Sequence, residues 1–146
     1  MEINEGLKQN LMERMEYSTE ELDIFLNNPR NKKVLAKSLN LLGKTIIFEV
    51  VESHGCNSLH KVGDKFYFDG AGNLLTKLSP KKICIYALAE LDKLIFAANE
   101  LLYAGVNPND IVFDRASCFD VGLKCGGWGQ IIMKISVVDR EKIKNV

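Results

Sequence analysis

The sequence predicts a small α+β protein, in which a helical N-terminal segment precedes a ββαββ arrangement with an antiparallel sheet around a long buried helix. Three observations predict this class. Apolar residues recur at helical spacing before Gly43, segments rich in β-branched residues follow it, and two pairs of strand-like segments flank one long apolar helix. A chain of 146 residues fits one ordinary domain, so we expect residues 1–43 and residues 44–146 to form one domain together.

The N-terminal segment is expected to contain three helices. Four apolar residues spaced four apart predict the first of them: Ile3, Leu7, Leu11 and Met15. Ser18 and Glu21 form a capping-box pattern that opens a second, short helix, which residues 27–29 end. A third helix is predicted over about residues 31–42, with Gly43 as its stop.

Four segments are expected to be strands because they are short and rich in β-branched or aromatic residues: 45–52, 65–69, 111–115 and 130–138. The last one alternates poorly between apolar and polar residues, which predicts burial on both faces. Ser79 and Pro80 form an N-cap pattern that predicts a long helix as far as Ala104, capped by Gly105. This helix is apolar nearly all round, so we expect it to be the central helix or the interface of a homo-oligomer.

Composition and patterning exclude several classes of function. Lys+Arg and Asp+Glu both number 19, and this zero net charge argues against a nucleic-acid partner. The N-terminus lacks a signal-peptide pattern, and the longest apolar stretch, residues 83–89, is too short to span a membrane. We therefore expect a cytoplasmic protein with four reduced cysteines and no membrane association. Glycine-rich nucleotide fingerprints are missing from the sequence, so no nucleotide cofactor is expected.

A first candidate loop follows the first predicted strand. It holds the only two histidines of the chain, His54 and His60, with Cys56 between them. Imidazole and thiolate at this spacing can reach one transition metal. We expect a divalent ion, Zn or Fe, held by His54, Cys56, His60 and, from a second loop, Cys118. The alternative is that His54 ends a strand and His60 caps a turn, each hydrogen-bonded to the backbone.

The second candidate loop precedes the last predicted strand. It contains Cys118, Asp120, Cys125, Trp128 and four glycines. Glycine lets the backbone approach a ligand closely, and an indole ring can stack on that ligand. We expect Gly127 and Trp128 to bind substrate. The alternative is a wide hairpin turn with Trp128 folded onto the edge of the sheet.

The two loops are expected to meet at one end of the sheet, above the start of the long helix, where Cys84 lies. A helix N-terminus lowers the pKa of a thiol and favours anions. Cys84 would then contact substrate. The predicted catalytic residues are His60, Asp64, Cys118 and Asp120, which supply a Cys–His pair for nucleophilic catalysis and an aspartate as general base.

Several segments resemble a family of small uncharacterised bacterial proteins, often from anaerobes, that carry a Cys…KVG segment, a Cys at a helix start and a late Cys-x-Asp. The segments in this chain are Gly55-Cys56, His60-Lys-Val-Gly-Asp-Lys-Phe66, Ile83-Cys84 and Ser117-Cys118-Phe-Asp120. The resemblance covers about residues 44–139 and implies that Cys56, Cys84 and Cys118 are functional positions. It implies no particular activity. His54, Cys125 and the Gly-Gly-Trp-Gly sequence depart from the family's pattern.

These observations predict a small cytoplasmic enzyme with a Cys/His/Asp site that acts on a small organic substrate by hydrolysis, hydration or isomerisation, assisted by a metal or a thiolate. The alternative is a non-catalytic accessory subunit or binding module of a bacterial catabolic complex. In that case two surfaces would contact the partner. One is the N-terminal segment, in which residues 1–23 carry seven acidic and two basic side chains, and the other is the long apolar helix. An iron–sulfur carrier is a third hypothesis, although the scattered cysteines are unlike the usual compact runs.

Overall fold

A computed structural model describes residues 3–143 of the chain, apart from the side chain of Leu39. The chain divides into two compact units, residues 1–39 and residues 40–146, close to the boundary that the sequence predicts after residue 43. The division does not test the prediction that both parts form one domain.

The three N-terminal helices are confirmed as α1 (Glu5–Met15), α2 (Thr19–Asn27) and α3 (Pro29–Leu42). The predicted capping box is present, because Glu21 N–H donates to Ser18 Oγ at 3.2 Å and Ser18 N–H donates to the Glu21 carboxylate at 2.8 Å. These two bonds satisfy N–H groups that have no partner within the helix. Helix α3 begins slightly earlier than predicted, with a proline in its first turn, where the missing N–H costs nothing.

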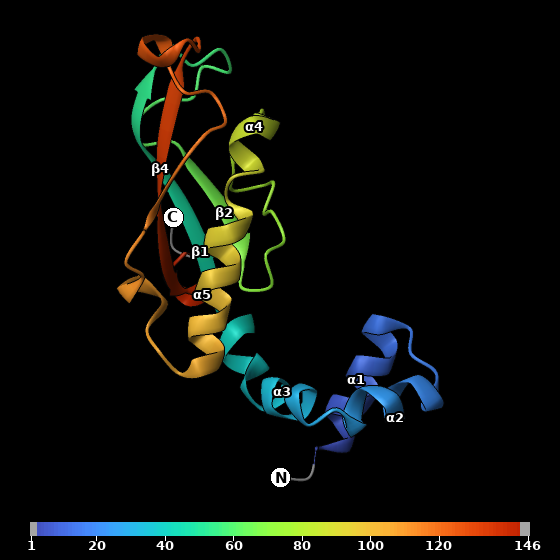
Figure 1. Cartoon of the computed structure of the whole chain (residues 1–146). Coiled ribbons are helices and arrows are strands. Elements are labelled where there is room, and N and C mark those ends of the chain that lie inside the picture. Colours follow the sequence, from blue (N-terminus) through green and yellow to red (C-terminus); the bar gives the residue numbers. More distant parts are fainter. Residues whose placement is uncertain (1–2, 144–146) are drawn as a thin grey trace. The chain divides into compact units, whose positions relative to one another are not determined.

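Residues 40–146 contain a four-stranded antiparallel sheet (Figure 1), which confirms the predicted α+β class. The sheet has the order β2-β1-β4-β3. Its strands are β1 (Lys44–His54), β2 (Lys65–Asp69), β3 (Arg115–Ser117) and β4 (Gln130–Asp139). The strand predicted over residues 111–115 is wrong in its bounds, because β3 only begins at Arg115. Val112 and Phe113 instead lie in an exposed loop before it.

One face of the sheet carries the hydrophobic core. The buried apolar side chains on β1 and β4 are every second residue: Ile46, Phe48, Val50, Ile131, Met133, Ile135 and Val137. Strand β2 adds Phe66 and Phe68, whose ring packs edge-on against Phe48 at 5.8 Å. The prediction that the last strand is buried on both faces is therefore wrong. Successive side chains of a strand point to opposite faces, and Lys134 on the opposite face of β4 is exposed.

The predicted long helix is shorter than expected and interrupted. It begins at Ile85 and consists of α4 (Ile85–Leu88) and α5 (Asp92–Ala104), separated by residues 89–91. The prediction that Ser79 caps this helix is wrong, because its hydroxyl instead accepts the N–H of Tyr67 at 2.9 Å. The predicted cap at the other end is confirmed, since Gly105 has a φ of +77°.

The helical stretch contributes Ala87, Leu91 and Ala98 to the core on the sheet. Other apolar side chains of this stretch are exposed, with Phe96 at 67%. The helical stretch is therefore not buried on all sides in the structure described. The prediction that it forms a subunit interface stays a prediction. Among the residues that the structure describes, we find no helix both long enough and apolar enough to cross a membrane.

Candidate functional site

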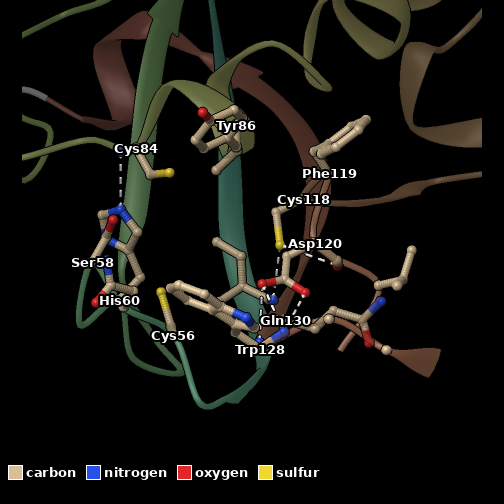
Figure 2. Close-up of a pocket in the computed structure, with 17 residues that line it drawn as sticks. Cys56, Ser58, His60, Cys84, Tyr86, Cys118, Phe119, Asp120, Trp128 and Gln130 are labelled. Carbon is tan, nitrogen blue, oxygen red and sulfur yellow. Dashed lines mark hydrogen bonds between the residues drawn. The ribbon is translucent and has the colours of Figure 1, made fainter. Parts of the chain in front are cut away.

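A cavity of about 690 Å³ opens where β1 ends and β4 begins. Its walls come from the loop after β1, the start of α4 and the loop before β4 (Figure 2). The two loops predicted to meet above the start of the helical stretch therefore do meet. All of the predicted site residues except His54 and Asp64 line this one cavity: Cys56, His60, Cys84, Cys118, Asp120, Gly127 and Trp128.

Glycines allow the two loops to approach each other. A Cβ atom on Gly129 would lie 2.0 Å from the carbonyl oxygen of Gly55, and one on Gly55 would lie 2.8 Å from the carbonyl oxygen of Trp128. Real Cβ atoms do not come this close to backbone atoms. Gly55 also has a φ of +66°, a conformation that glycine adopts without steric cost. Any larger residue at either position would push the two walls of the cavity apart.

Asp120 organises the loop before β4. Its carboxylate accepts hydrogen bonds from the backbone N–H groups of Gly122 at 2.9 Å, Trp128 at 3.0 Å and Gly129 at 3.0 Å. The amides of Gly122 and Gly129, with that of Trp128, lower the pKa of Asp120 below its ordinary value. A Cβ atom on Gly127 would lie 2.0 Å from Asp120 Oδ1. These contacts indicate that Asp120 shapes the loop, and they do not favour its predicted role as a general base.

His60 is almost fully buried, with 4% of its surface exposed, and its ring packs edge-on against Phe66 at 5.1 Å. Its Nε2 accepts the N–H of Cys84 at 3.3 Å, so Nε2 carries no proton and Nδ1 is the protonated nitrogen. Desolvation lowers the pKa of His60, and the charge of Lys82 adds to this, while Asp64 opposes it. His60 is therefore neutral at pH 7.

Asp64 lies behind His60 and does not line the cavity. Its Oδ2 atom is 3.8 Å from His60 Nδ1 and accepts the N–H of Lys61 at 2.9 Å. The carboxylate closes the turn and faces the protonated nitrogen of the imidazole. This geometry fits a residue that orients His60 better than one that acts on a substrate.

Cys84 occupies the N-cap position of α4, and its sulfur points toward the middle of the cavity (Figure 2). Burial acts to raise the pKa of its thiol, but the Ser58 side chain and the amides of Ala87 and Tyr86 outweigh burial, and the pKa is lowered. The sequence predicts Cys84 as a substrate-binding residue. Its surroundings also favour the thiolate, which is the nucleophilic form of the group.

Cys118 has a different environment. Its Sγ accepts the N–H of Ile131 at 3.4 Å and donates to the carbonyl oxygen of Asp120 at 3.7 Å. Its own N–H donates to the carbonyl oxygen of Ile131 at 3.1 Å, which continues the pairing of β3 and β4. These bonds hold the Cys118 side chain in place as part of the cavity wall. All four cysteines are free, and Cys125 is exposed and lies outside the cavity lining.

The four predicted metal ligands do not form a donor set. His54 is the last residue of β1, is exposed, and pairs with Gln130 across the sheet, away from the cavity lining. Nε2 of His60 is already occupied by the N–H of Cys84. Within residues 3–143, three or more His, Cys, Asp or Glu side chains are nowhere grouped so that they could hold a metal ion. His54 does end a strand, as the alternative expects, and His60 Nε2 accepts a backbone N–H, although that of Cys84 and not one within its own turn.

Three aromatic side chains surround the mouth of the cavity. Tyr86, Phe119 and Trp128 are 63%, 73% and 81% exposed, and all three belong to its lining. The rings of Tyr86 and Phe119 are 6.3 Å apart, and Phe119 N–H donates to the carbonyl oxygen of Tyr86 at 3.1 Å. Trp128 is thus not folded onto the sheet edge. We call these three residues the aromatic rim.

Sequence reasoning did not identify Ser58, Tyr86 or Phe119 as site residues. Tyr86 and Phe119 each lie within two positions of a predicted cysteine, and this proximity was the available signal. Ser58 lies equally close to Cys56 and His60, but its contact with Cys84, from another part of the chain, had no local signal.

Comparison of the chain with family models, curated proteins and solved structures finds no match. The resemblance of residues 44–139 to a bacterial family therefore remains a prediction based on the motifs quoted above. The three cysteines to which it points, Cys56, Cys84 and Cys118, all line the cavity.

Proposed function

We propose that this protein is a thiol-dependent hydrolase of small organic acyl compounds, with Cys84 as its nucleophile. The observation that carries the proposal is the environment of Cys84. Its sulfur points into a cavity large enough for a small molecule, and neighbouring groups lower the pKa of its thiol. The proposal includes a reducing, cytoplasmic location, in which the thiol persists.

His60 is a positioning residue in this proposal. Its Nε2 atom bonds the backbone N–H of Cys84, so it holds the nucleophile without taking a proton from the sulfur. Asp64 faces the other nitrogen of the ring and fixes the tautomer. The thiolate fraction of Cys84 then depends on Ser58 and on the amides of Ala87 and Tyr86.

The proposed reaction forms an acyl intermediate. The Cys84 thiolate adds to the carbonyl carbon of an ester, and the π electrons of the C=O bond move to oxygen. Collapse of this adduct breaks the bond to the leaving alkoxide, which takes a proton from water and departs as an alcohol. The hydroxide so formed adds to the thioester carbon, and cleavage of the S–C bond releases a carboxylic acid and restores the thiolate.

Hydrolysis is favoured over hydration or isomerisation because the latter two need a free general base at the substrate. The candidate bases are already engaged. Asp120 accepts three backbone N–H groups, Asp64 lies outside the cavity lining, and both ring nitrogens of His60 face protein groups. Covalent catalysis by a thiolate does not depend on any of them.

The test is to incubate the purified protein with a series of p-nitrophenyl esters and to measure p-nitrophenol release and intact mass. We expect turnover and an acyl adduct on Cys84, both lost in Cys84→Ser. Cys125→Ser is the matched control and should keep both, because Cys125 is exposed and lies outside the cavity. Unchanged turnover in Cys84→Ser, or no turnover with any ester, would refute the proposed hydrolase.

A binding module is the second candidate, and exposed apolar residues outside the cavity favour it. Val112 and Phe113 are 85% and 82% exposed in the loop before β3, and Phe96 is exposed on α5. Such side chains are typical of surfaces that contact a partner. This candidate predicts a stable complex with a partner protein and no turnover of any ester in the series.

A further inference from the structure

The aromatic rim indicates which kind of molecule the cavity accepts. Tyr86, Phe119 and Trp128 come from two separate segments of the chain and are largely exposed, although each lines the cavity. Large aromatic side chains are rarely left exposed side by side, because burying them is favourable. Together they offer ring faces and edges to a flat group that enters the cavity.

The charge of the cavity walls indicates the charge of the ligand. The residues that line the cavity include no lysine and no arginine, so an anionic ligand would find no counter-charge there. The only ionised carboxylate of the lining is Asp120, and it already accepts three backbone N–H groups. A cation would therefore lose water without gaining a free carboxylate, and the other anionic group of the lining, the Cys84 thiolate, is already bonded by Ser58 and by the amides of Ala87 and Tyr86. The buried His60 is neutral and bonded to Cys84.

We propose that the ligand of this cavity is an uncharged aromatic compound whose ring is held by the aromatic rim and whose carbonyl group lies toward Cys84. This inference rests on the proposed function only for the role of the carbonyl group. The recognition of a neutral ring depends on the rim and on the charge of the walls. A volume of about 690 Å³ accommodates an aromatic ring with a short substituent.

Ligand binding can be measured directly through the fluorescence of Trp128, because Trp128 is the only tryptophan of the chain and it lines the cavity. A ring that stacks near an exposed indole changes its fluorescence emission. The probes are benzamide, benzoate and benzamidine, which are similar in shape and are neutral, anionic and cationic. Titrations use the Cys84→Ser variant, so that no chemistry at the thiol affects binding, and calorimetry checks the affinities.

We expect benzamide to change the emission of Trp128 and to bind at least about tenfold more tightly than benzoate or benzamidine. Phe119→Ala should weaken benzamide by about tenfold, the upper range for loss of one aromatic contact. Leu123→Ala is the matched control and should bind as the parent does, because Leu123 is similarly exposed, at 69%, but does not line the cavity.

Equal affinity for the three probes, tighter binding of either charged probe, or no binding of benzamide would overturn the inference. An unchanged affinity in Phe119→Ala would also overturn it. Because the titrations use Cys84→Ser, a failed ester assay leaves this result standing as evidence for a binding site. Ester turnover together with failed benzamide binding would refute the ligand class alone.

Discussion

His60 Nε2 accepts the backbone N–H of Cys84 at 3.3 Å, and this bond connects the loop after β1 to the start of α4. The histidine is 4% exposed and packs against Phe66 of the core, so the residue that holds the cysteine is itself held by the sheet. Few conformations of the Cys84 backbone satisfy this bond. The relationship explains how a short helix of four residues can present a thiol in a fixed place.

Replacing His60 tests this relationship. His60→Ala should lower the free energy of unfolding by about 2–4 kcal/mol, because it removes a buried ring and leaves the N–H of Cys84 without its acceptor. Denaturant unfolding measures the change. His54→Ala is the control and should lie within about 0.5 kcal/mol of the parent, because His54 is exposed. Similar losses in both variants would show that His60 does not hold the site.

The lowered pKa of His60 predicts a pH dependence of stability. The unfolded histidine takes up a proton below its ordinary value of 6.5, whereas the folded one resists protonation until a lower pH. Stability is therefore greatest above pH 6.5 and falls as the pH drops from 6.5 toward the folded pKa, by at most about 1.4 kcal/mol per pH unit. Unfolding measured from pH 5 to pH 8 tests this. His60→Gln does not titrate there, so an identical profile in that variant would contradict the assignment.

The contact between Gly55 and Gly129 predicts a strong effect of a single methyl group. Gly129→Ala places a Cβ atom 2.0 Å from the carbonyl oxygen of Gly55, so the two loops must separate. We expect a loss of about 3 kcal/mol, near the upper end for overpacking, together with weaker benzamide binding. Gly63→Ala is the control, because its Cβ meets no atom within 4 Å and only its φ of +94° is unfavourable, at about 1–2 kcal/mol. Equal benzamide affinity in both variants would argue against a cavity formed by these loops.

The hydrogen bonds of Asp120 indicate that it shapes the cavity and does not act as a base. In Asp120→Asn one carboxylate oxygen becomes an NH₂ group, which cannot accept an N–H group, so the bond from Gly122 or the bond from Gly129 is lost. We expect benzamide to bind at least about tenfold more weakly, because charge-assisted bonds no longer fix the loop that carries Trp128. The pH profile of Cys84 alkylation should be unchanged. A profile that shifts in this variant would restore Asp120 as a proton-transfer group.

Local patterns predicted much of this structure. The capping box of Ser18 and Glu21 and the C-cap at Gly105 depend on residues a few positions apart, and both are present. Ser79 shows why other predictions failed. Its hydroxyl accepts the N–H of Tyr67 on β2, a partner 12 residues away, and this contact overrides a local cap pattern.

The difference between local patterns and contacts of distant residues also applies to the site. The sequence predicted that the two loops converge, and Cys56, His60, Cys84 and Cys118 do line one cavity. It did not predict their roles. The sulfur of Cys118 accepts the N–H of Ile131 on the neighbouring strand, and the carboxylate of Asp120 accepts backbone N–H groups up to nine residues away. Residue type and spacing indicate where reactive groups gather, whereas the hydrogen-bond partners that decide their chemistry come from the folded loops.

The measurement that tests the central claim most directly is the rate of alkylation of each cysteine by iodoacetamide as a function of pH, followed by peptide mass spectrometry. We expect the alkylation rate of Cys84 to give an apparent pKa below the ordinary thiol value of 9.0. Free cysteine in the same solution is alkylated in parallel as a reference. Cys118, whose sulfur is hydrogen-bonded within the wall, should react far more slowly. An apparent pKa of Cys84 at or above 9.0, or faster reaction at Cys118, would contradict the claim that Cys84 is the nucleophile.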